Sequence, residues 1–129
     1  MKDIFIARTI ESPEVDFKFS CNVLSLAGEA YPENASEFFR PILLALESFL
    51  EASDNKDIEF NFRLTYFNSA STKMLYSMFG LLDESASTKN RIILNWHHDK
   101  DDDTMLEYGE SVKDDFNALD FRLVETELA

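Results

Sequence analysis

A short polar segment, Asn68-Ser69-Ala70-Ser71-Thr72-Lys73, combines three hydroxyl side chains with an amide and an amine. It stands where an alternating apolar pattern ends at Phe67 and a helical apolar pattern begins at Met74. A helix start leaves backbone N–H groups unpaired, so we expect Asn68 or Ser69 to cap one of them. Capping requires only one side chain, so the other polar side chains of the segment are not explained by the cap. The second interpretation is a phosphorylation site at Ser69, with the phosphate at the positive end of the helix.

A catalytic interpretation of the same serine requires a base nearby. His97 and Asp99 follow another predicted strand, whose end should lie near Ser69, so a nucleophile, a base and an orienting acid are available. The sequence lacks the G-x-S-x-G elbow typical of many serine hydrolases. A histidine after a strand is more often a hydrogen-bonded structural residue. A small serine hydrolase using Ser69 and His97 is therefore the less favoured alternative.

An acidic run matches the spacing of a calcium-binding loop. The carboxylates at that spacing are Asp99, Asp101, Asp103, Glu107 and Glu110. Thr104 replaces the glycine that the sharp turn of such a loop requires, and the apolar residues after it indicate a helix. We therefore favour a carboxylate-rich helix start, stabilised by the helix macrodipole, and expect no metal or other cofactor.

The elements that position these residues follow from the apolar periodicity. In order, they are an edge strand at 4–7, a hairpin over 15–28 with its turn at Cys21 and Asn22, a helix within 36–53, a strand at 58–66, a helix at about 70–87, a strand at 92–96, a helix from the acidic run to 116, and a strand at 121–124. Alternation of helices and strands predicts crossover connections and parallel strands. We expect one α/β domain over residues 1–129, with a mixed sheet whose N-terminal hairpin precedes largely parallel strands.

Two local features of this pattern matter for the helices and the core. Asn34 and Glu37 have the spacing of a capping pair before the first helix. Pro41 lies inside the helical pattern, so the helix either is kinked there or begins near Arg40, with Pro41 at its first position. Trp96 is predicted to fill the core beside the Phe-rich strands.

The charge of the chain excludes several classes of partner. Twenty-five acidic against twelve basic residues give a formal net charge of −13, with no cluster of Lys and Arg. A nucleic-acid backbone or an anionic membrane surface would be repelled. The single cysteine, Cys21, cannot form an internal disulfide. The first residues do not resemble a signal peptide and no apolar segment reaches spanning length, so we expect a soluble cytoplasmic protein.

Four stretches resemble the SiaC family of bacterial regulatory phosphoproteins, and together they extend along essentially the whole chain. They are Gly28-Glu29-Ala30-Tyr31-Pro32-Glu33-Asn34, Tyr66-Phe67-Asn68-Ser69-Ala70-Ser71-Thr72-Lys73, Trp96-His97-His98-Asp99 and the acidic segment through Glu107-Tyr108-Gly109-Glu110. The chain departs from the family pattern at Ala30, where Ser is usual, and at His98, where Tyr is usual.

The resemblance implies a switch protein with a fold similar to the anti-sigma factor antagonists, which is STAS-like. In such a family the unmodified form binds and activates a diguanylate cyclase, raises cyclic di-GMP and so controls biofilm formation and aggregation. A dedicated kinase and a PP2C-type phosphatase set the level of phosphorylation. The protein itself is then no enzyme. The alternative within the same class is a partner-switching protein similar to an anti-sigma factor antagonist.

The resemblance also indicates which residues form the site. The phosphoryl acceptor falls on Ser69, where the best-described member of the family has Thr, and Ser71 and Thr72 are alternative acceptors. The partner-binding residues implied are Asn68, Ser69, Ala70, Ser71 and Lys73, together with Tyr31 and Glu33 of the earlier motif.

Overall fold

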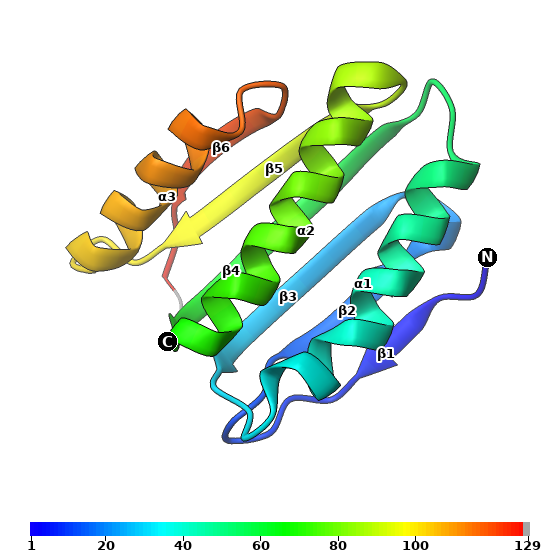
Figure 1. The fold of residues 1–129 in the computed structure, drawn as a ribbon. Coiled ribbons are helices and arrows are strands. Elements are labelled where there is room, and N and C mark those ends of the chain that lie inside the picture. The colour runs from blue at the N-terminus through cyan, green and yellow to red at the C-terminus, as the bar shows by residue number, and fades with distance from the viewer. Residues whose placement is uncertain (128–129) are drawn as a thin grey trace.

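Three helices alternate with the last four strands, and each helix connects two strands that lie side by side in one sheet (Figure 1). The computed structural model describes residues 1–127 of the chain. Its strands are β1 (Ile4–Ile6), β2 (Glu14–Lys18), β3 (Val23–Ala30), β4 (Asp57–Phe67), β5 (Arg91–His98) and β6 (Asp120–Glu125). The helices are α1 (Ala35–Ala52), α2 (Ser69–Thr88), α3 (Asp103–Asp115) and the 3-10 turn η1 (Phe19–Cys21).

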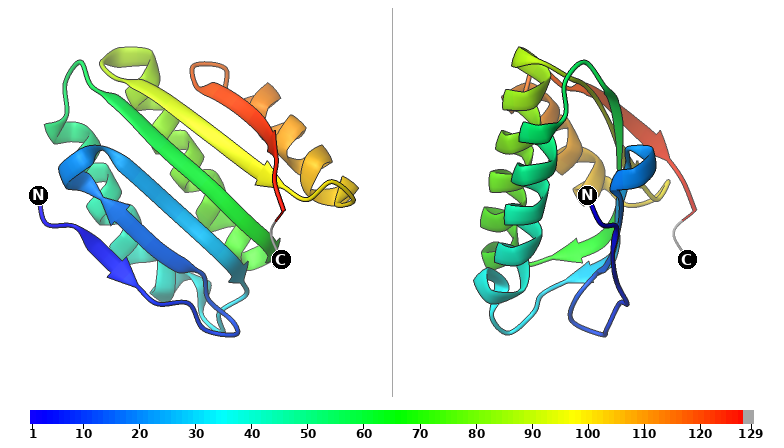
Figure 2. Two further views of the ribbon diagram at one scale, coloured as in Figure 1. Left: turned by 180° about the vertical axis from the view of Figure 1, so that it is seen from behind. Right: turned by 90° about the vertical axis from the view of Figure 1, so that its right-hand side faces the viewer.

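The strands stand in the sheet in the order in which they occur in the chain, from β1 to β6. β1, β2 and β3 pair antiparallel, whereas β3 to β6 pair parallel. This confirms the predicted mixed sheet with an N-terminal hairpin and largely parallel strands. Crossovers of one hand that always advance to the next strand place every helix on the same face. Figure 2 accordingly shows α1, α2 and α3 together on one side of the sheet.

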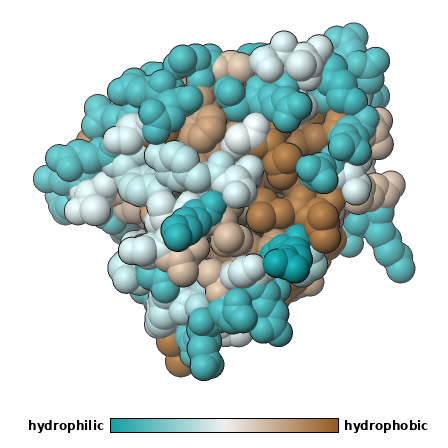
Figure 3. All heavy atoms as spheres, viewed as in Figure 1, coloured by the Kyte–Doolittle hydropathy of each residue, from teal (hydrophilic) through white to brown (hydrophobic). Residues whose placement is uncertain are grey.

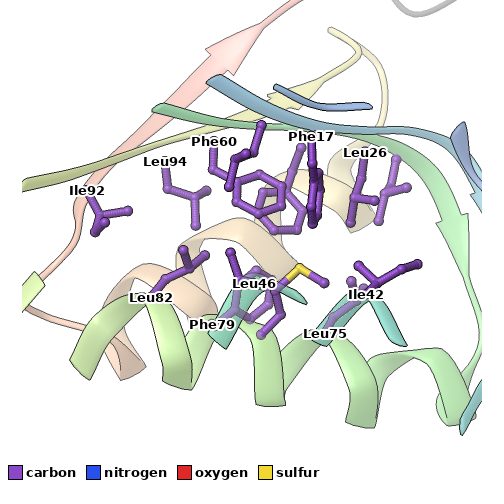
Figure 4. Close-up of a cluster of buried hydrophobic side chains, with 14 of the residues drawn as sticks. Phe17, Leu26, Ile42, Leu46, Phe60, Leu75, Phe79, Leu82, Ile92 and Leu94 are labelled. Atoms are coloured by element: carbon purple, nitrogen blue, oxygen red, sulfur yellow. The ribbon is translucent and has the colours of Figure 1, made fainter. Parts of the chain in front are cut away.

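The core lies between the sheet and its helices. Phe17, Phe60 and Trp96 from the strands are at most 1% exposed, as are Leu75 and Phe79 from α2. In Figure 4, side chains of the sheet face side chains of α1 and α2 across this layer. Each fully buried side chain of this size contributes about 1.5 to 3 kcal/mol. The predicted core position of Trp96 is confirmed.

The opposite face of the sheet is covered by no helix of the described chain, although parallel strands are normally covered on both faces. Its side chains are largely polar and in register, with Asn61 on β4 paired with Asn95 on β5. The amide of Asn95 donates to Asn61 Oδ1 at 3.1 Å, and the amide of Asn61 donates to Glu59 Oε2 at 3.0 Å. The first bond joins β5 to β4 and the second lies within β4, and such polar side chains let this face of a parallel sheet meet water.

The start of α1 decides against one of the two interpretations of Pro41. Asn34 Oδ1 accepts from the backbone N–H of Glu37 at 3.0 Å, as the capping pair predicted, and the helix runs unbroken from Ala35 to Ala52. The alternative start near Arg40 is therefore wrong. Pro41 is exposed, so its ring points away from the sheet, and burial of Phe39 before it and Ile42 after it outweighs the lost backbone bond.

The N-terminal strands follow the sequence prediction closely. β1 lies at the edge of the sheet, and β2 and β3 form the hairpin. Its connection is η1 followed by Asn22, whose φ of 61° is the left-handed conformation that asparagine tolerates. Across residues 1–127, none of the helices combines the length and apolar character that crossing a membrane would require.

Two glycines inside helices provide a matched test of the packing. A Cβ on Gly109 of α3 would lie 2.5 Å from Trp96 Cδ1, whereas a Cβ on Gly80 of α2 would meet no atom within 4 Å. We expect Gly109→Ala to lower the free energy of unfolding by about 1 to 3 kcal/mol, because the methyl group overpacks the core. Gly80→Ala should raise it by about 1 kcal/mol through helix propensity. Urea unfolding of both variants checks this, and a Gly109→Ala protein more stable than wild type would contradict it.

Candidate functional site

Asn68 is the single residue between the end of β4 and the start of α2. Its backbone N–H donates to the carbonyl of Ala30 at 3.2 Å, which ties the junction to the end of β3. Its side-chain Oδ1 accepts from the N–H of Ser71 at 3.0 Å, and its carbonyl accepts from the N–H of Thr72 at 2.9 Å. Asn68 is thus the helix cap, and of the two residues expected to cap, Ser69 is left free of this role.

The helix turns the three hydroxyls of the junction in different directions. Ser69 and Ser71 are two residues apart, which places them about 200° apart around the helix axis. Ser69 is exposed, whereas Ser71 is 0% exposed and its Oγ has no hydrogen-bond partner among the described residues. Thr72 is half-buried, and its hydroxyl donates to the carbonyl of Asn68 at 3.0 Å. Of these three residues, Ser69 is the most exposed.

Ser69 lies beside two hollows of the surface. One, of about 420 Å³, is lined by Ser69 itself and by Thr72, Asp102 and Tyr108. The other, of about 1070 Å³, begins one residue further along α2 and includes Ala70, Lys73 and Glu33 in its lining. The small side chain of Ala70 leaves this side open. The structure thus brings Glu33, Ala70 and Lys73 of the sequence prediction together at one surface.

The other residue predicted to face a partner, Tyr31, lies at the same edge of the sheet. Its ring packs edge-on against Tyr66 at the end of β4, with ring centroids 5.8 Å apart. Tyr66 itself is 50% exposed. Sequence reasoning missed this exposure, because Tyr66 continues the alternating buried face of β4. One signal for this exposure was available in the sequence. Tyr66 lies close to the polar segment at the end of its strand, and the end of a strand extends beyond the helices that cover the sheet.

Acidic residues dominate one side of the junction. Asp102 caps α3, with its Oδ1 accepting from the N–H of Met105 at 3.0 Å, and Asp99, Asp101 and Glu125 line an adjoining hollow of about 710 Å³. Asp103 follows directly in the first turn of α3. Within residues 1–127, no group of three His, Cys, Asp or Glu side chains is placed to hold a metal ion. Asp102 and Asp103 stand at the start of α3, as the helix-start interpretation of this run predicted.

Tyr108 forms the inner wall of the hollow beside Ser69. Its ring stacks on Trp96 with centroids 5.8 Å apart and meets Phe67 edge-on at 4.7 Å. Burial raises the pKa of the Tyr108 hydroxyl, and the nearby hydroxyl of Thr72 offsets part of this rise. The hollow therefore has a neutral aromatic wall and an acidic rim.

His97 lies on the uncovered face of the sheet and does not contact Ser69. Its Nε2 lies 3.1 Å from Asn61 Oδ1, and its Nδ1 lies 2.8 Å from the hydroxyl oxygen of Thr126. Since Asn61 Oδ1 is an acceptor, Nε2 carries the proton and Nδ1 accepts from Thr126 in the neutral ring. Both ring nitrogens are thus engaged, one by Asn61 of β4 and the other by Thr126 just after β6. The structure does not assemble the nucleophile and base that the hydrolase alternative requires.

Comparisons with known proteins agree on one family. The profile described as SiaC family regulatory phosphoprotein matches residues 6–126. An uncharacterized protein of Pseudomonas aeruginosa strain UCBPP-PA14 is 30% identical over 115 residues, which cover 89% of this chain and 90% of that protein.

Two solved structures resemble the fold over almost its whole length. Apo-SiaC from Pseudomonas aeruginosa has a TM-score of 0.86 and 28% identity, covering 98% of this chain and 100% of that one. A chain from the crystal structure of diguanylate cyclase SiaD in complex with its activator SiaC, also from Pseudomonas aeruginosa, has a TM-score of 0.90 and 27% identity. That match covers 96% of this chain and 100% of the other.

The buried, unpaired hydroxyl of Ser71 generates a stability prediction. Ser71→Ala removes a polar atom that is desolvated without a compensating hydrogen bond, so we expect the free energy of unfolding to rise by about 1 kcal/mol. Urea unfolding measures the change. A loss of stability of the same size would mean that the hydroxyl has a partner after all.

The contacts of His97 generate a pH prediction. Burial lowers the pKa of His97 below its ordinary 6.5, and Arg63 acts in the same direction. The unfolded chain therefore binds a proton before the folded one does, so stability should fall as the pH drops below 6.5 and stop falling below the folded pKa. His97→Gln removes this contribution. The free energy of unfolding at about pH 7.5 minus that at about pH 5.5 should be smaller for the variant, and an unchanged difference would contradict the prediction.

Proposed function

The chain belongs to the SiaC family of regulatory phosphoproteins, and from this premise we propose that its unmodified form binds and activates a diguanylate cyclase. The similarity to a chain from the complex of diguanylate cyclase SiaD with its activator SiaC supports this proposal. Activation of the cyclase raises cyclic di-GMP and thereby promotes biofilm formation. The protein acts by binding and is not itself catalytic, in keeping with a His97 ring whose two nitrogens are engaged by Asn61 and Thr126.

The switch in this proposal is phosphorylation of Ser69 by a kinase and its reversal by a PP2C-type phosphatase. The observation that carries it is the difference in exposure between the hydroxyls of the junction. Ser69 is exposed on the first residue of α2, Ser71 is fully buried, and the hydroxyl of Thr72 is bonded to the carbonyl of Asn68. A transferase reaches the first without unfolding the helix.

A phosphoryl group on Ser69 would prevent docking by its charge and its hydration. It adds about −1.5 to −2 charges at neutral pH. The start of α2 stabilises that charge by about 0.3 to 1 kcal/mol when exposed. The hollow that Ser69 itself lines contains no Lys or Arg and includes Asp102, so it does not draw the phosphate inward, and the phosphate stays on the docking surface. A partner that covers Ser69 would then have to strip water from a dianion, which the unmodified protein does not require.

Substitutions at Ser69 test the proposal. Ser69→Asp should lose binding to the cyclase while it keeps the wild-type melting temperature, because a fixed charge replaces the phosphate at an exposed position. Ser69→Ala should bind as wild type does and resist the kinase. Binding is measured by titration with each full-length diguanylate cyclase of the source organism, and modification by intact mass after incubation with the kinase.

Ser111→Asp is the matched control, since Ser111 is an exposed serine on α3 and its substitution adds the same charge elsewhere. It should bind normally. Equal binding by Ser69→Asp and Ser111→Asp would refute occlusion, and a wild-type protein that binds none of the cyclases would refute the proposed function itself.

A further inference from the structure

The covering layer of the sheet contains an open groove between α1 and α2. The two helices run side by side in the same direction (Figure 1). The groove between them has a volume of about 680 Å³, and half-buried Leu43, Met74 and Leu81 lie in its lining. Leu44 at its side is 58% exposed, and Gly80 leaves its middle without a side chain. Figure 3 shows hydrophobic atoms gathered on this face, with hydrophilic ones around them.

Charged residues are distributed unevenly along the groove. Arg40 on α1 and Lys73 on α2 lie toward the end where Ser69 begins α2. Glu47 and Glu84 lie toward the opposite end, where the groove continues into a hollow that Glu51 also lines. Two further carboxylates, Glu33 and Glu37, line the mouth beyond the basic pair, and Lys89 lies beyond the acidic one. Between the pair Arg40 and Lys73 and the pair Glu47 and Glu84 the groove is therefore basic, then apolar, then acidic, with residues of the opposite charge beyond each pair.

We propose that this groove is the docking site for an amphipathic helix of the diguanylate cyclase, which lies antiparallel to α1 and α2. The inference rests on the proposed function, in which the unmodified chain binds such an enzyme. The apolar stripe of the partner helix covers Leu44, Met74 and Gly80. Its acidic residues lie beside Arg40 and Lys73 near its C-terminal end, and its basic residues lie beside Glu47 and Glu84.

A helix is the occupant that this shape fits. Two parallel helices expose ridges and a groove between them, into which the side-chain ridges of a third helix pack. The groove from Met74 to Glu84 extends about 15 Å along α2, which corresponds to about three turns. The macrodipoles of α1 and α2 both have their positive ends near Ser69, so an antiparallel partner is favoured. This orientation agrees with the charge sequence of the groove.

The arrangement also explains why modification one turn before Lys73 would control docking. Ser69 and Lys73 are four residues apart on a helix, the spacing at which side chains meet. A phosphate on Ser69 pairs with Lys73, removes it from the partner's acidic residues and repels them. Phosphorylation thus acts on the basic end of the groove without any change of fold.

Two substitutions at one position test the docking site. Gly80→Gln places a long side chain in the open middle of the groove, where no atom of the chain lies within 4 Å of the added Cβ, so the fold is kept. It should weaken binding to the cyclase at least about tenfold, because the partner helix is displaced. Gly80→Ala, the matched control, should bind as wild type does. Both variants are titrated with the full-length cyclase that the wild type binds, and their folding is checked by melting temperature.

A second pair tests the charge pattern. Lys73→Glu should weaken binding about tenfold, whereas Lys113→Glu, at an exposed position on α3, should leave it unchanged. If Gly80→Gln binds with full affinity while Ser69→Asp does not, the groove proposal is wrong and the proposed function stands. If wild type binds no cyclase, both are wrong. If the chain dimerises and Gly80→Gln disperses the dimer, the groove holds a second copy instead, which also overturns the proposal.

Discussion

The geometry of the candidate site depends on one residue, Asn68, which ends a strand and caps a helix at the same time. Its backbone N–H is bonded to Ala30 on the neighbouring strand, and its side chain is bonded to Ser71 in the first turn of α2. Because these two bonds fix the end of β4 and the first turn of α2, the helix begins in one orientation about its own axis. That orientation turns Ser71 into the core and Ser69 to the solvent, so accessibility of the hydroxyl follows from the cap and not from the serine itself.

The order of the strands determines what surrounds this junction. Because each crossover advances to the next strand with the same hand, α1 and α2 lie adjacent on one face and begin at the same edge of the sheet. The groove between them therefore opens beside Ser69. No helix covers the other face, and its polar side chains are hydrogen-bonded to one another, as Asn95 is to Asn61. A structural role within that face also accounts for His97, whose neutral ring joins β4 to the segment after β6.

Much of the fold could be predicted, because periods of two and of 3.6 residues distinguish strands from helices in this sequence and alternation predicts a parallel sheet. The sequence does not decide those features that change when a helix or strand is shifted by one residue. The choice between Ser69 and Ser71 changes with each 100° of helix rotation, so it required the observed cap. The contacts of His97 depend on pairing across three strands. The exposure of Tyr66 depends on how far the layer of helices extends over the sheet, and this extent cannot be predicted from the local sequence pattern.

The most direct test of the account is site-resolved mass spectrometry of the chain after incubation with the proposed kinase. We predict one phosphoryl group per chain, located on Ser69, in the fraction that no longer binds the cyclase. A phosphoryl group on Ser71, on Thr72 or elsewhere in that fraction, with Ser69 unmodified, would contradict the claim that the capped junction exposes the controlling hydroxyl.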